Sequence, residues 1–365
     1  MLFAEHPQVQ RNVLLSPFTT LGLGGSARWY ISATTVDDVI YARQWALDHG
    51  QPLVVLGGGS NVVVSDSGVD GLVVHINIKG CKTTTNKNQL ELEVSAGEDW
   101  DPIVAKVVQT GFGGLECLSG IPGSVGGTPI QNVGAYGQEV SDSIQRVRAI
   151  DSTENRVVEI ENQDCGFSYR SSRFKTTDVG RFILTHVIFQ LRTKKAKAVY
   201  PDVIKWLNDE GVQEPSVADV RRAVLAIRRT KGMVLDLSDS DTRSIGSFFV
   251  NPVIDNEMYS RMTKDCKGSL PGFKLSKEEV KIPAAWLIEQ VGFLKGHRTG
   301  EVGLSSKHPL AIINRGKATA REVIDLAVLI KRRVADRFGI LLKPEARLVG
   351  FETDDAIKFL YKVNH

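Results

Sequence analysis

The chain has 365 residues, 42% of them hydrophobic, which is enough for two or three ordinary domains with cores of their own. Its 45 basic and 42 acidic side chains leave a net charge of only +3, so charge gives no reason to expect a nucleic-acid or membrane partner. Four widely separated cysteines without C-x-x-C spacing predict neither a metal site nor a disulfide framework, and the absence of a signal-like start or an apolar run of ~18 residues predicts a cytoplasmic protein.

The first predicted elements form a β-α-β pattern. A strand over 28–33 and a helix over 36–49 lead to a second strand over 53–56, which ends at Gly57-Gly58-Gly59-Ser60-Asn61. This run lacks the G-x-G-x-x-G of a Rossmann site, and the β-branched Val62-Val63-Val64 that follows favours a strand over a helix. A phosphate held here is therefore predicted to bind the amides of a turn.

An α+β region follows. Alternating apolar residues between Asp70 and Ala96 predict half-buried strands. Asp101 and Pro102 predict the N-cap and first position of a helix that Gly111 ends. Further strands are expected at 144–150, 157–160 and 182–191.

The stretch GGLECLSGIPGSVGGTPIQNVGAYG (113–137) contains eight glycines. Glycine adopts positive φ freely and lets other atoms approach the main chain, so this composition suits several N–H groups that point at one anion. The alternative is a glycine-rich surface loop. The aliphatic side chains of Ile121, Val125, Ile130 and Val133, which alternate with the glycines, argue against a solvated linker.

The C-terminal part is predicted to contain three helices, each begun by a capping signal or a proline, over 216–229, 283–291 and 319–339. The last of these begins at a Thr319–Glu322 capping box and ends at Gly339. A strand is expected at 311–314 and another over 340–349, and a charged tail over 352–365 ends the chain.

Five motifs resemble, in the same order, those of the UDP-N-acetylenolpyruvoylglucosamine reductases, flavoenzymes that make UDP-N-acetylmuramate for bacterial peptidoglycan. They are LGGGSN (56–61), PGSVGGTPIQNVGAYGQEV (122–140), YRSSRFK (169–175), GSFFVNP (246–252) and LLKPEARLVG (341–350). The resemblance implies an α+β protein with a two-lobe FAD-binding fold of the PCMH/vanillyl-alcohol-oxidase type and a C-terminal α+β substrate domain. It also implies a first FAD-binding lobe over 1–70, completed by the strand near 340–350, a second lobe over 71–231, a substrate-binding domain over 232–340, and a tail over 351–365.

Non-covalently bound FAD, reduced by NADPH as a co-substrate, is the chemistry that this resemblance implies. The expected FAD contacts are Gly57, Gly58, Gly59, Ser60, Asn61, Ser119, Gly120, Pro122, Gly123, Ser124, Gly126, Gly127, Asn132, Gly134 and Ala135.

Three residues match the catalytic positions of the family. Arg170 would stabilise the charge that develops on the substrate carboxylate, and Ser247 would donate a proton to carbon. Glu345 would polarise the enolpyruvyl group of UDP-N-acetylglucosamine enolpyruvate. Without the family, Arg170 is one of 45 basic residues and Ser247 is a turn residue after Gly246.

Substrate contacts are matched at Tyr200, Lys231, Asn251 and His308. Tyr200 matches a tyrosine that folds over the substrate in the larger-loop class of the family, although Pro201 stands where glycine is common. Lys231 matches a lysine near the substrate pyrophosphate, whereas the Gly-Met that follows it differs from the Leu-Pro of some relatives. His308 could equally be a partly buried loop histidine.

Three alternatives compete with the reductase. An oxidase of the same fold would act on a small alcohol or lactone; many such relatives bind FAD covalently through histidine, and neither glycine-rich segment contains one. A nucleotide-binding module would hold the ligand without turning anything over. A Rossmann dehydrogenase is disfavoured by the missing fingerprint. We expect a monomer that acts on small molecules.

Overall fold

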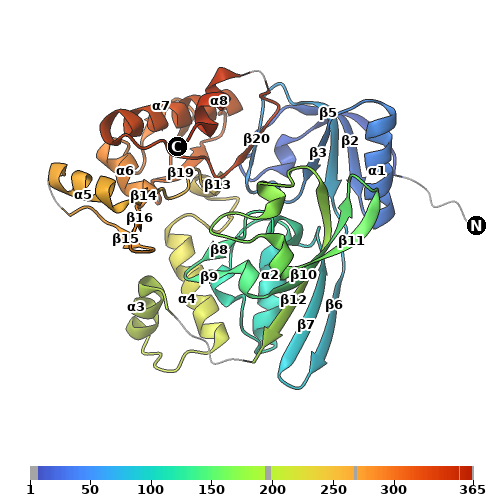
Figure 1. The fold of residues 1–365 in the computed structure, drawn as a ribbon, viewed down its shortest axis with the longest axis horizontal. Helices are drawn as coiled ribbons and strands as arrows, with labels where there is room; N and C mark the ends of the chain where they lie inside the picture. Colours follow the sequence, from blue (N-terminus) through green and yellow to red (C-terminus); the bar gives the residue numbers. More distant parts are fainter. Residues whose placement is uncertain (1–6, 194–198, 267–268, 353, 364–365) are drawn as a thin grey trace, which may run out of the picture. The chain divides into compact units, whose positions relative to one another are not determined.

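The structure is a computed structural model, which describes residues 7–193, 199–266, 269–352 and 354–363 (Figure 1). The chain divides into two compact units. Unit 1 takes in the N-terminal segment up to Val13, Ser26–Gly59 and Val69–Leu235, and unit 2 takes in Leu14–Gly25, Ser60–Gly68 and the chain from Asp236 onward. The predicted four-part division into lobes, substrate domain and tail stays a prediction.

Unit 1 begins with a four-stranded sheet in the order β1-β2-β5-β3, in which β2 and β3 run parallel to β5. Its strands are β1 (Gln10–Leu14), β2 (Ser26–Ala33), β3 (Leu53–Leu56) and β5 (Val69–Ile76). Helix α1 (Val36–Asp48) packs against β2 and β5 and begins at a Thr35–Asp38 capping box (Figure 1). The predicted β-α-β pattern is confirmed, because its aliphatic side chains form one buried cluster.

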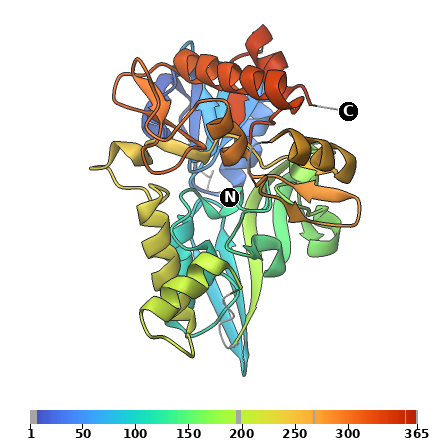
Figure 2. The ribbon, with the colours of Figure 1, turned by 90° about the vertical axis from the view of Figure 1, so that its left-hand side faces the viewer.

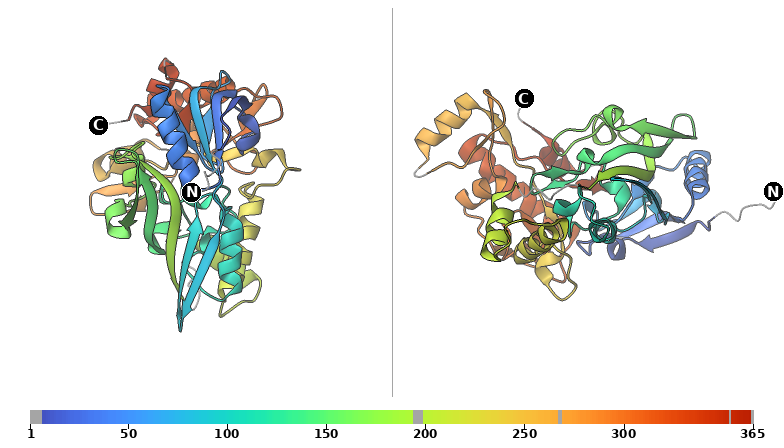
Figure 3. Two further views of the ribbon diagram at one scale, coloured as in Figure 1. Left: turned by 90° about the vertical axis from the view of Figure 1, so that its right-hand side faces the viewer. Right: turned by 90° about the horizontal axis from the view of Figure 1, so that it is seen from below.

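The second sheet of unit 1 is antiparallel throughout, in the order β11-β10-β12-β7-β6 (Figure 3). Its strands are β6 (Cys81–Asn86), β7 (Gln89–Ser95), β10 (Ile144–Asp151), β11 (Arg156–Glu161) and β12 (Phe182–Arg192). Along β7, Leu90, Leu92 and Val94 are buried and alternate with more exposed residues, as the sequence pattern predicted.

Helix α2 (Trp100–Gln109) starts earlier than predicted. Its N-cap is Asp99, not Asp101, because the Trp100 N–H bonds to the Gly123 carbonyl at 2.9 Å and its indole is buried. The Asp101 carboxylate is thereby free to bind groups outside the helix.

Two further helices, α3 (Pro201–Asp209) and α4 (Val217–Thr230), lie side by side (Figure 2). Helix α4 begins at the predicted Ser216 capping box. Helix α3 was not predicted from the sequence.

The described residues of unit 2 form three small sheets. The first has the order β13 (Ser244–Ser247), β19 (Ala311–Asn314), β18 (Val302–Leu304), β17 (Arg298–Thr299), and the second has the order β14 (Val253–Asp255), β16 (Glu279–Lys281), β15 (Phe273–Lys274). The third is a parallel pair of β4 (Val62–Val64) and β20 (Arg347–Val349). Strand β4 confirms the prediction that a strand, not a helix, follows the first glycine run.

The helices of unit 2 are α5 (Asn256–Asp265), α6 (Ala284–Gln290), α7 (Ala320–Phe338) and α8 (Asp355–Tyr361). Helix α7 has the predicted Thr319–Glu322 capping box and ends at Gly339, which has φ 69°. Asp66 adds two hydrogen bonds at its start, from the Ala320 and Arg321 N–H groups. The apolar face of α7 forms the centre of the core of unit 2.

Two predictions at the end of the chain are wrong in detail. The strand expected over 340–349 is regular only at β20, because Pro344 has no N–H to donate and forms only an isolated bridge with Phe249. Pro283 is the N-cap of α6 and not its first residue. The charged tail, in contrast, forms helix α8, of which Leu360 is fully buried.

Lys331 of α7 is fully buried, and its Nζ donates to the carbonyls of Leu360 and Lys362 at 2.6 Å and 2.5 Å. Burial, with a smaller contribution from the charge of Lys362, lowers the pKa of this ammonium from 10.5 to about 8. The unfolded chain therefore holds more protons than the folded chain between these two values, so stability should increase as the pH rises through this window.

We expect wild type to gain stability relative to Lys331→Met between pH ~8 and ~10.5, by up to about 1.4 kcal/mol per pH unit. Guanidinium unfolding of both proteins at several pH values measures this difference, since the other titrating groups cancel. A difference that stays flat across the window would contradict the assigned lowering of the pKa.

Within the described ranges, no helix is both long and apolar enough to cross a bilayer. The same residues contain no group of three or more His, Cys, Asp or Glu side chains that could hold a metal ion.

Candidate active site

The two glycine-rich segments of unit 1 touch each other through their main chains. The Gly58 N–H donates to Ser124 Oγ at 3.1 Å. A Cβ on Gly58 would lie 2.7 Å from both Gly123 Cα and Ser124 N, closer than any side chain allows. Glycine is required at position 58 because a second backbone passes directly over it.

The arrangement leaves main-chain donors available. The N–H groups of Val125 and Gly126 bond to the carbonyls of Glu98 and Ala96, but among the described residues none accepts from the N–H groups of Gly59, Gly123 and Ser124. Gly59 and Gly123 have φ of 60° and 121°. A turn of this kind with free N–H groups binds anions, so these residues fit the diphosphate of FAD.

Both main-chain polar groups of Gly120, its N–H and its carbonyl, are hydrogen-bonded to side chains. Its N–H donates to Asp101 Oδ1 at 2.6 Å, and its carbonyl accepts from Arg228 Nη2 at 3.3 Å. The Asp101 carboxylate also accepts two hydrogen bonds from Arg221 of α4, at 2.6 Å and 2.9 Å. Burial raises the pKa of Asp101, but the bonds from Arg221 and Gly120 outweigh it and hold the pKa below its usual range.

We expect Asp101→Asn to lower the free energy of unfolding by about 1.5–3 kcal/mol, because it removes a charged acceptor from two half-buried donors. It should also weaken FAD binding, since Gly120 has φ 71° and loses its clamp. Chemical denaturation and flavin titration measure the two effects. The control is Asp209→Asn, which breaks the exposed Lys205–Asp209 pair and should change stability by less than about 1 kcal/mol. Equal effects of both substitutions would contradict the clamp.

Several predicted FAD residues have structural partners of their own. Ser119 is buried and donates to the Glu116 carbonyl at 2.6 Å. Asn132 is buried with φ 46°, and its side chain bonds to Glu139, the Ser168 carbonyl and the Ser141 N–H. Asn132 therefore fixes the turn that leads to the short strand β8 (Gly134–Ala135), which pairs with β9 (Gln138–Glu139).

Arg170 has a positive φ of 54°, which is strained for a residue with a side chain. Its Nη2 donates to the Gly134 carbonyl at 2.6 Å, and a Cβ on Gly134 would lie 3.1 Å from Arg170 Nη1. The structure thus joins the predicted catalytic arginine to the predicted FAD segment, and Gly134 leaves room for it.

Tyr136 is the centre of a second cluster in unit 1 that the sequence did not single out. Its φ is 50°, its ring packs edge-on against Tyr200 at 5.3 Å between centroids, and Lys231 Nζ lies 5.8 Å from its centroid. Lys231 also bonds to Asp202 at 2.9 Å. Burial lowers the pKa of Lys231, but the bond to Asp202 and nearby negative charge outweigh it and raise the pKa.

Arg228 was also missed. Its Nη2 donates to the Met233 carbonyl at 2.7 Å, while its Nε is buried without a hydrogen-bond partner among the described residues. Burial lowers the pKa of this guanidinium, and the charge of Arg170 lowers it further, against the opposing effects of Tyr136 and Asp101. The cations of unit 1 that surround Tyr136 suit an anionic ligand. Only the proximity of Arg228 to Lys231 in the sequence could have indicated this role.

In unit 2, the chain segments that carry Ser247 and Glu345 lie next to each other. The Glu345 N–H donates to the Phe248 carbonyl at 2.8 Å, and the Val250 N–H donates to the Lys343 carbonyl at 3.0 Å, so the two segments form a short antiparallel ladder. Ser247 follows Gly246, which has φ 76°. Both Ser247 and Glu345 are half-buried, so a hydroxyl and a carboxylate from distant parts of the sequence lie on adjacent chains.

Asn61, whose contact with FAD stays a prediction, bonds to the segment that carries Glu345. Its Nδ2 donates to the Glu345 carbonyl at 3.3 Å, and its own carbonyl accepts from the Arg347 N–H. Ser60 precedes it at the start of this segment of unit 2.

The two remaining predicted substrate residues have local partners in unit 2. Asn251 Oδ1 accepts from the Ala284 N–H at 2.9 Å and so caps α6. His308 Nδ1 accepts from the Leu310 N–H at 3.2 Å. The Leu310 carbonyl in turn accepts from the Phe248 N–H, which places the His308 turn beside Ser247.

Unit 1 therefore holds Arg170, Tyr200, Lys231 and most of the predicted FAD contacts, and unit 2 holds Ser247, Glu345, Asn251 and His308. Unit 1 offers N–H donors and cations, which suit phosphates and a carboxylate. Unit 2 offers a hydroxyl and a carboxylate, which suit proton transfer.

Comparison with known proteins gives two matching family models and many relatives. Residues 27–161 match an FAD binding domain, and residues 238–349 match the C-terminal domain of UDP-N-acetylenolpyruvoylglucosamine reductase. The chain is 43% identical over 350 residues to the UDP-N-acetylenolpyruvoylglucosamine reductase of Thermobifida fusca, covering 93% of this chain and 98% of that protein. It is 44% identical to the one from Salinispora arenicola, covering 94% and 96%.

A crystal structure of UDP-N-acetylenolpyruvylglucosamine reductase from Thermus caldophilus matches with a TM-score of 0.63 and 25% identity, covering 94% of this chain and 99% of that one. The predicted fold class is confirmed: the chain has an α+β fold with an FAD-binding domain of the vanillyl-alcohol-oxidase type and a C-terminal α+β domain.

Proposed function

The chain belongs to the UDP-N-acetylenolpyruvoylglucosamine reductase family, and on that premise we propose that it reduces UDP-N-acetylglucosamine enolpyruvate to UDP-N-acetylmuramate with NADPH. It is a flavoprotein oxidoreductase. The product of the proposed reaction is a precursor of bacterial peptidoglycan. The observation that carries this proposal is the ladder between Phe248 and Glu345, which places the chain segments that carry Ser247 and Glu345 next to each other within the matched C-terminal domain.

FAD, when bound, supplies hydride to the enolpyruvyl group. The residues that would hold it are Gly59, Gly123 and Ser124, through their main-chain N–H groups. Gly58 keeps these donors together, because only a residue without a Cβ lets the Gly123–Ser124 main chain pass so close to it.

Arg170 is proposed to stabilise the negative charge that spreads onto the substrate carboxylate during reduction. Its bond to the Gly134 carbonyl and its strained backbone fix the guanidinium before substrate arrives. A preorganised cation of this kind needs no rearrangement as the charge develops, which is why it favours the transition state over the bound substrate.

Ser247 is proposed to donate the final proton from its Oγ to the substrate carbon. A hydroxyl is a weak acid at neutral pH, so it protonates carbon only when the accepting carbanion is strongly basic and close. The carboxyl group of Glu345, which belongs to the adjacent chain segment, is proposed to polarise the enolpyruvyl group. Tyr200, Lys231, Asn251 and His308 are proposed substrate contacts.

The experiment that tests the proposal incubates the protein with NADPH and UDP-N-acetylglucosamine enolpyruvate without oxygen and identifies the product by mass spectrometry. The proposed function predicts UDP-N-acetylmuramate, heavier than the substrate by two hydrogens, in an amount equal to the NADPH consumed. NADPH consumption that requires oxygen and leaves the enol ether unchanged would instead indicate an oxidase or another flavin reductase.

A further inference from the structure

Strand β20 begins two residues after Glu345, and one of its two edges is hydrogen-bonded to strand β4. Its Arg347 N–H donates to the Asn61 carbonyl at 3.1 Å, and its Val349 carbonyl accepts from the Ser65 N–H at 2.9 Å, both on the side of β4. Because successive peptide groups of a strand point to opposite sides, the Leu348 N–H and the Ala346 carbonyl face the other edge. β20 and β4 form a sheet of two strands, and no third strand from the part of the chain that the structure describes covers that edge.

The hydroxyl of Tyr361, the last residue of α8, meets this edge. The Leu348 N–H donates to the Tyr361 oxygen at 3.1 Å, and the Tyr361 hydroxyl donates to the Ala346 carbonyl at 3.5 Å. A phenol can accept and donate at once, so one side chain takes the place of a neighbouring strand. Burial raises the pKa of Tyr361, against the lowering effects of the Leu348 N–H and Arg347, so the hydroxyl keeps the proton that it donates.

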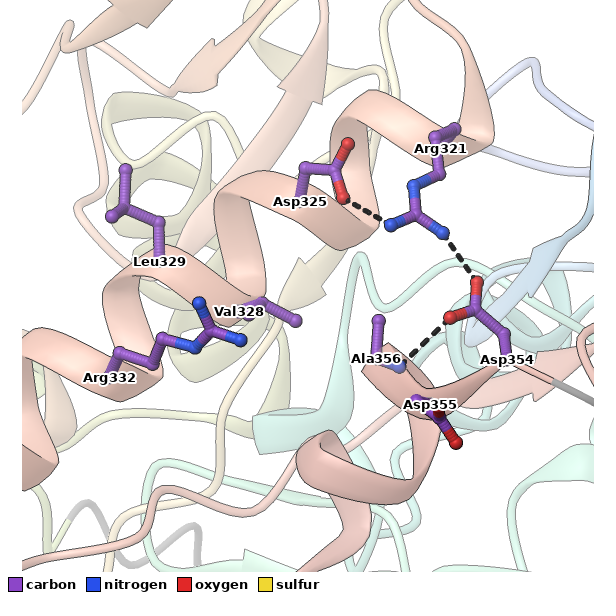
Figure 4. A pocket seen from close by; sticks show the side chains of 8 residues that line it. All are labelled: Arg321, Asp325, Val328, Leu329, Arg332, Asp354, Asp355 and Ala356. Atoms are coloured by element: carbon purple, nitrogen blue, oxygen red, sulfur yellow. Dashed lines mark hydrogen bonds and ion pairs between the residues drawn. The ribbon is translucent and has the colours of Figure 1, made fainter.

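Helix α8 is fastened at both ends to α7. At its start, Asp354 caps the Ala356 N–H at 2.9 Å and pairs with Arg321 at 2.6 Å, beside the polar groove drawn in Figure 4. At its end, Lys331 binds the carbonyls of Leu360 and Lys362. Tyr361 therefore approaches β20 from a helix that is itself held in place.

The main chain of Glu345 is thus bordered by three fixed groups. Phe248 accepts from its N–H, Asn61 donates to its carbonyl, and the Tyr361 hydroxyl holds the next residue, Ala346. A carboxylate that must meet a substrate within a few tenths of an ångström depends on such support.

We propose that Tyr361 is a positioning residue for Glu345, and that the C-terminal helix α8 is part of the catalytic architecture through the hydrogen bonds of Tyr361 to β20. The role rests on the proposed function, in which Glu345 polarises the enolpyruvyl group. Tyr361 itself touches neither substrate nor FAD in this account.

The test compares the flavin-loaded wild type with Tyr361→Phe, which keeps the ring and removes only the hydroxyl. The matched control is Lys358→Met, which breaks the exposed Lys358–Asp355 pair on the same helix and leaves Tyr361 in place. Three kinds of quantity are measured: the deuterium uptake of the peptide that contains Leu348, the single-turnover rates of flavin reduction by NADPH and of reoxidation by the enol ether, and the substrate KM.

In Tyr361→Phe, we expect the Leu348 amide hydrogen to exchange with deuterium roughly three- to tenfold faster than in wild type, which is the effect of losing one hydrogen bond. Reoxidation by the enol ether should slow about fivefold or more, with substrate KM and flavin reduction by NADPH unchanged. Lys358→Met should match wild type in all measurements.

Unchanged exchange would overturn the proposal, because the hydrogen bond would then be absent in solution. Faster exchange with an unchanged reoxidation rate would overturn it too, since Tyr361 would then support the fold alone. Wild-type protein that is never reoxidised by the enol ether would overturn the proposed function itself, and with it this role of Tyr361.

Discussion

Ser247→Ala should still allow NADPH to bleach the flavin at the wild-type rate, while turnover of the enol ether falls by roughly 10²–10⁴-fold, the usual contribution of a positioned general acid. The hydroxyl is proposed to act only when carbon is protonated, so flavin reduction, which comes earlier, does not need it. Ser247 lies on β13, whose main chain pairs with Ala311, so removing Oγ leaves the strand intact.

Stopped-flow absorbance separates the two half-reactions of this variant. The control is Ser260→Ala, which makes the same chemical change on α5 of unit 2 and loses a single exposed bond to the Asn256 carbonyl. It should behave as wild type. Equal slowing of both half-reactions in Ser247→Ala, or near wild-type turnover, would remove Ser247 from its assigned role.

Gly58→Ala should yield a protein that has lost most of its FAD. The new Cβ would lie 2.7 Å from Gly123 Cα and Ser124 N, which are backbone atoms and cannot rotate away. The two glycine-rich segments must therefore separate, which costs about 1–3 kcal/mol as overpacking and disperses the N–H groups proposed to hold the diphosphate. The flavin absorbance per protein and the temperature of unfolding of the apoprotein measure the two effects.

Gly57→Ala, one residue away, is the control for this collision. Its Cβ would meet only Ser124 Oγ, at 2.6 Å, and that side chain can rotate away. It should retain far more FAD than Gly58→Ala. If both variants kept the flavin, the close approach at Gly58 would have no role in cofactor binding.

The regular elements of the protein could be predicted because local signals specify them. The capping boxes at Ser216 and Thr319 and the alternation along β7 were visible in the sequence and are present in the structure. The boundary errors at Asp101 and Pro344 have different causes. A tertiary hydrogen bond from the Trp100 N–H to the Gly123 carbonyl accompanies the earlier start of α2, whereas Pro344 interrupts the expected strand because it has no N–H.

The partners of the site residues could not be predicted in this way. The ladder that joins Phe248 to Glu345 and the bond from Arg170 to Gly134 connect residues far apart in the sequence, and no periodicity encodes them. Tyr136 was hidden inside the glycine-rich motif, and Tyr361 lay in a tail whose composition suggested only charge. The Tyr136 ring packs against Tyr200, and the Tyr361 hydroxyl bonds to the main chain of β20, so each contact joins segments that are separate in the sequence.

Reduction of the enol ether by NADPH through FAD is tested by an anaerobic double-mixing experiment on the flavin-loaded wild-type protein, which adds NADPH first and UDP-N-acetylglucosamine enolpyruvate second. We expect the visible flavin band to bleach with NADPH and to recover fully when the enol ether is added. Bleaching that persists until air is admitted would contradict the reductase assignment, and a protein without any flavin band would contradict the cofactor site itself.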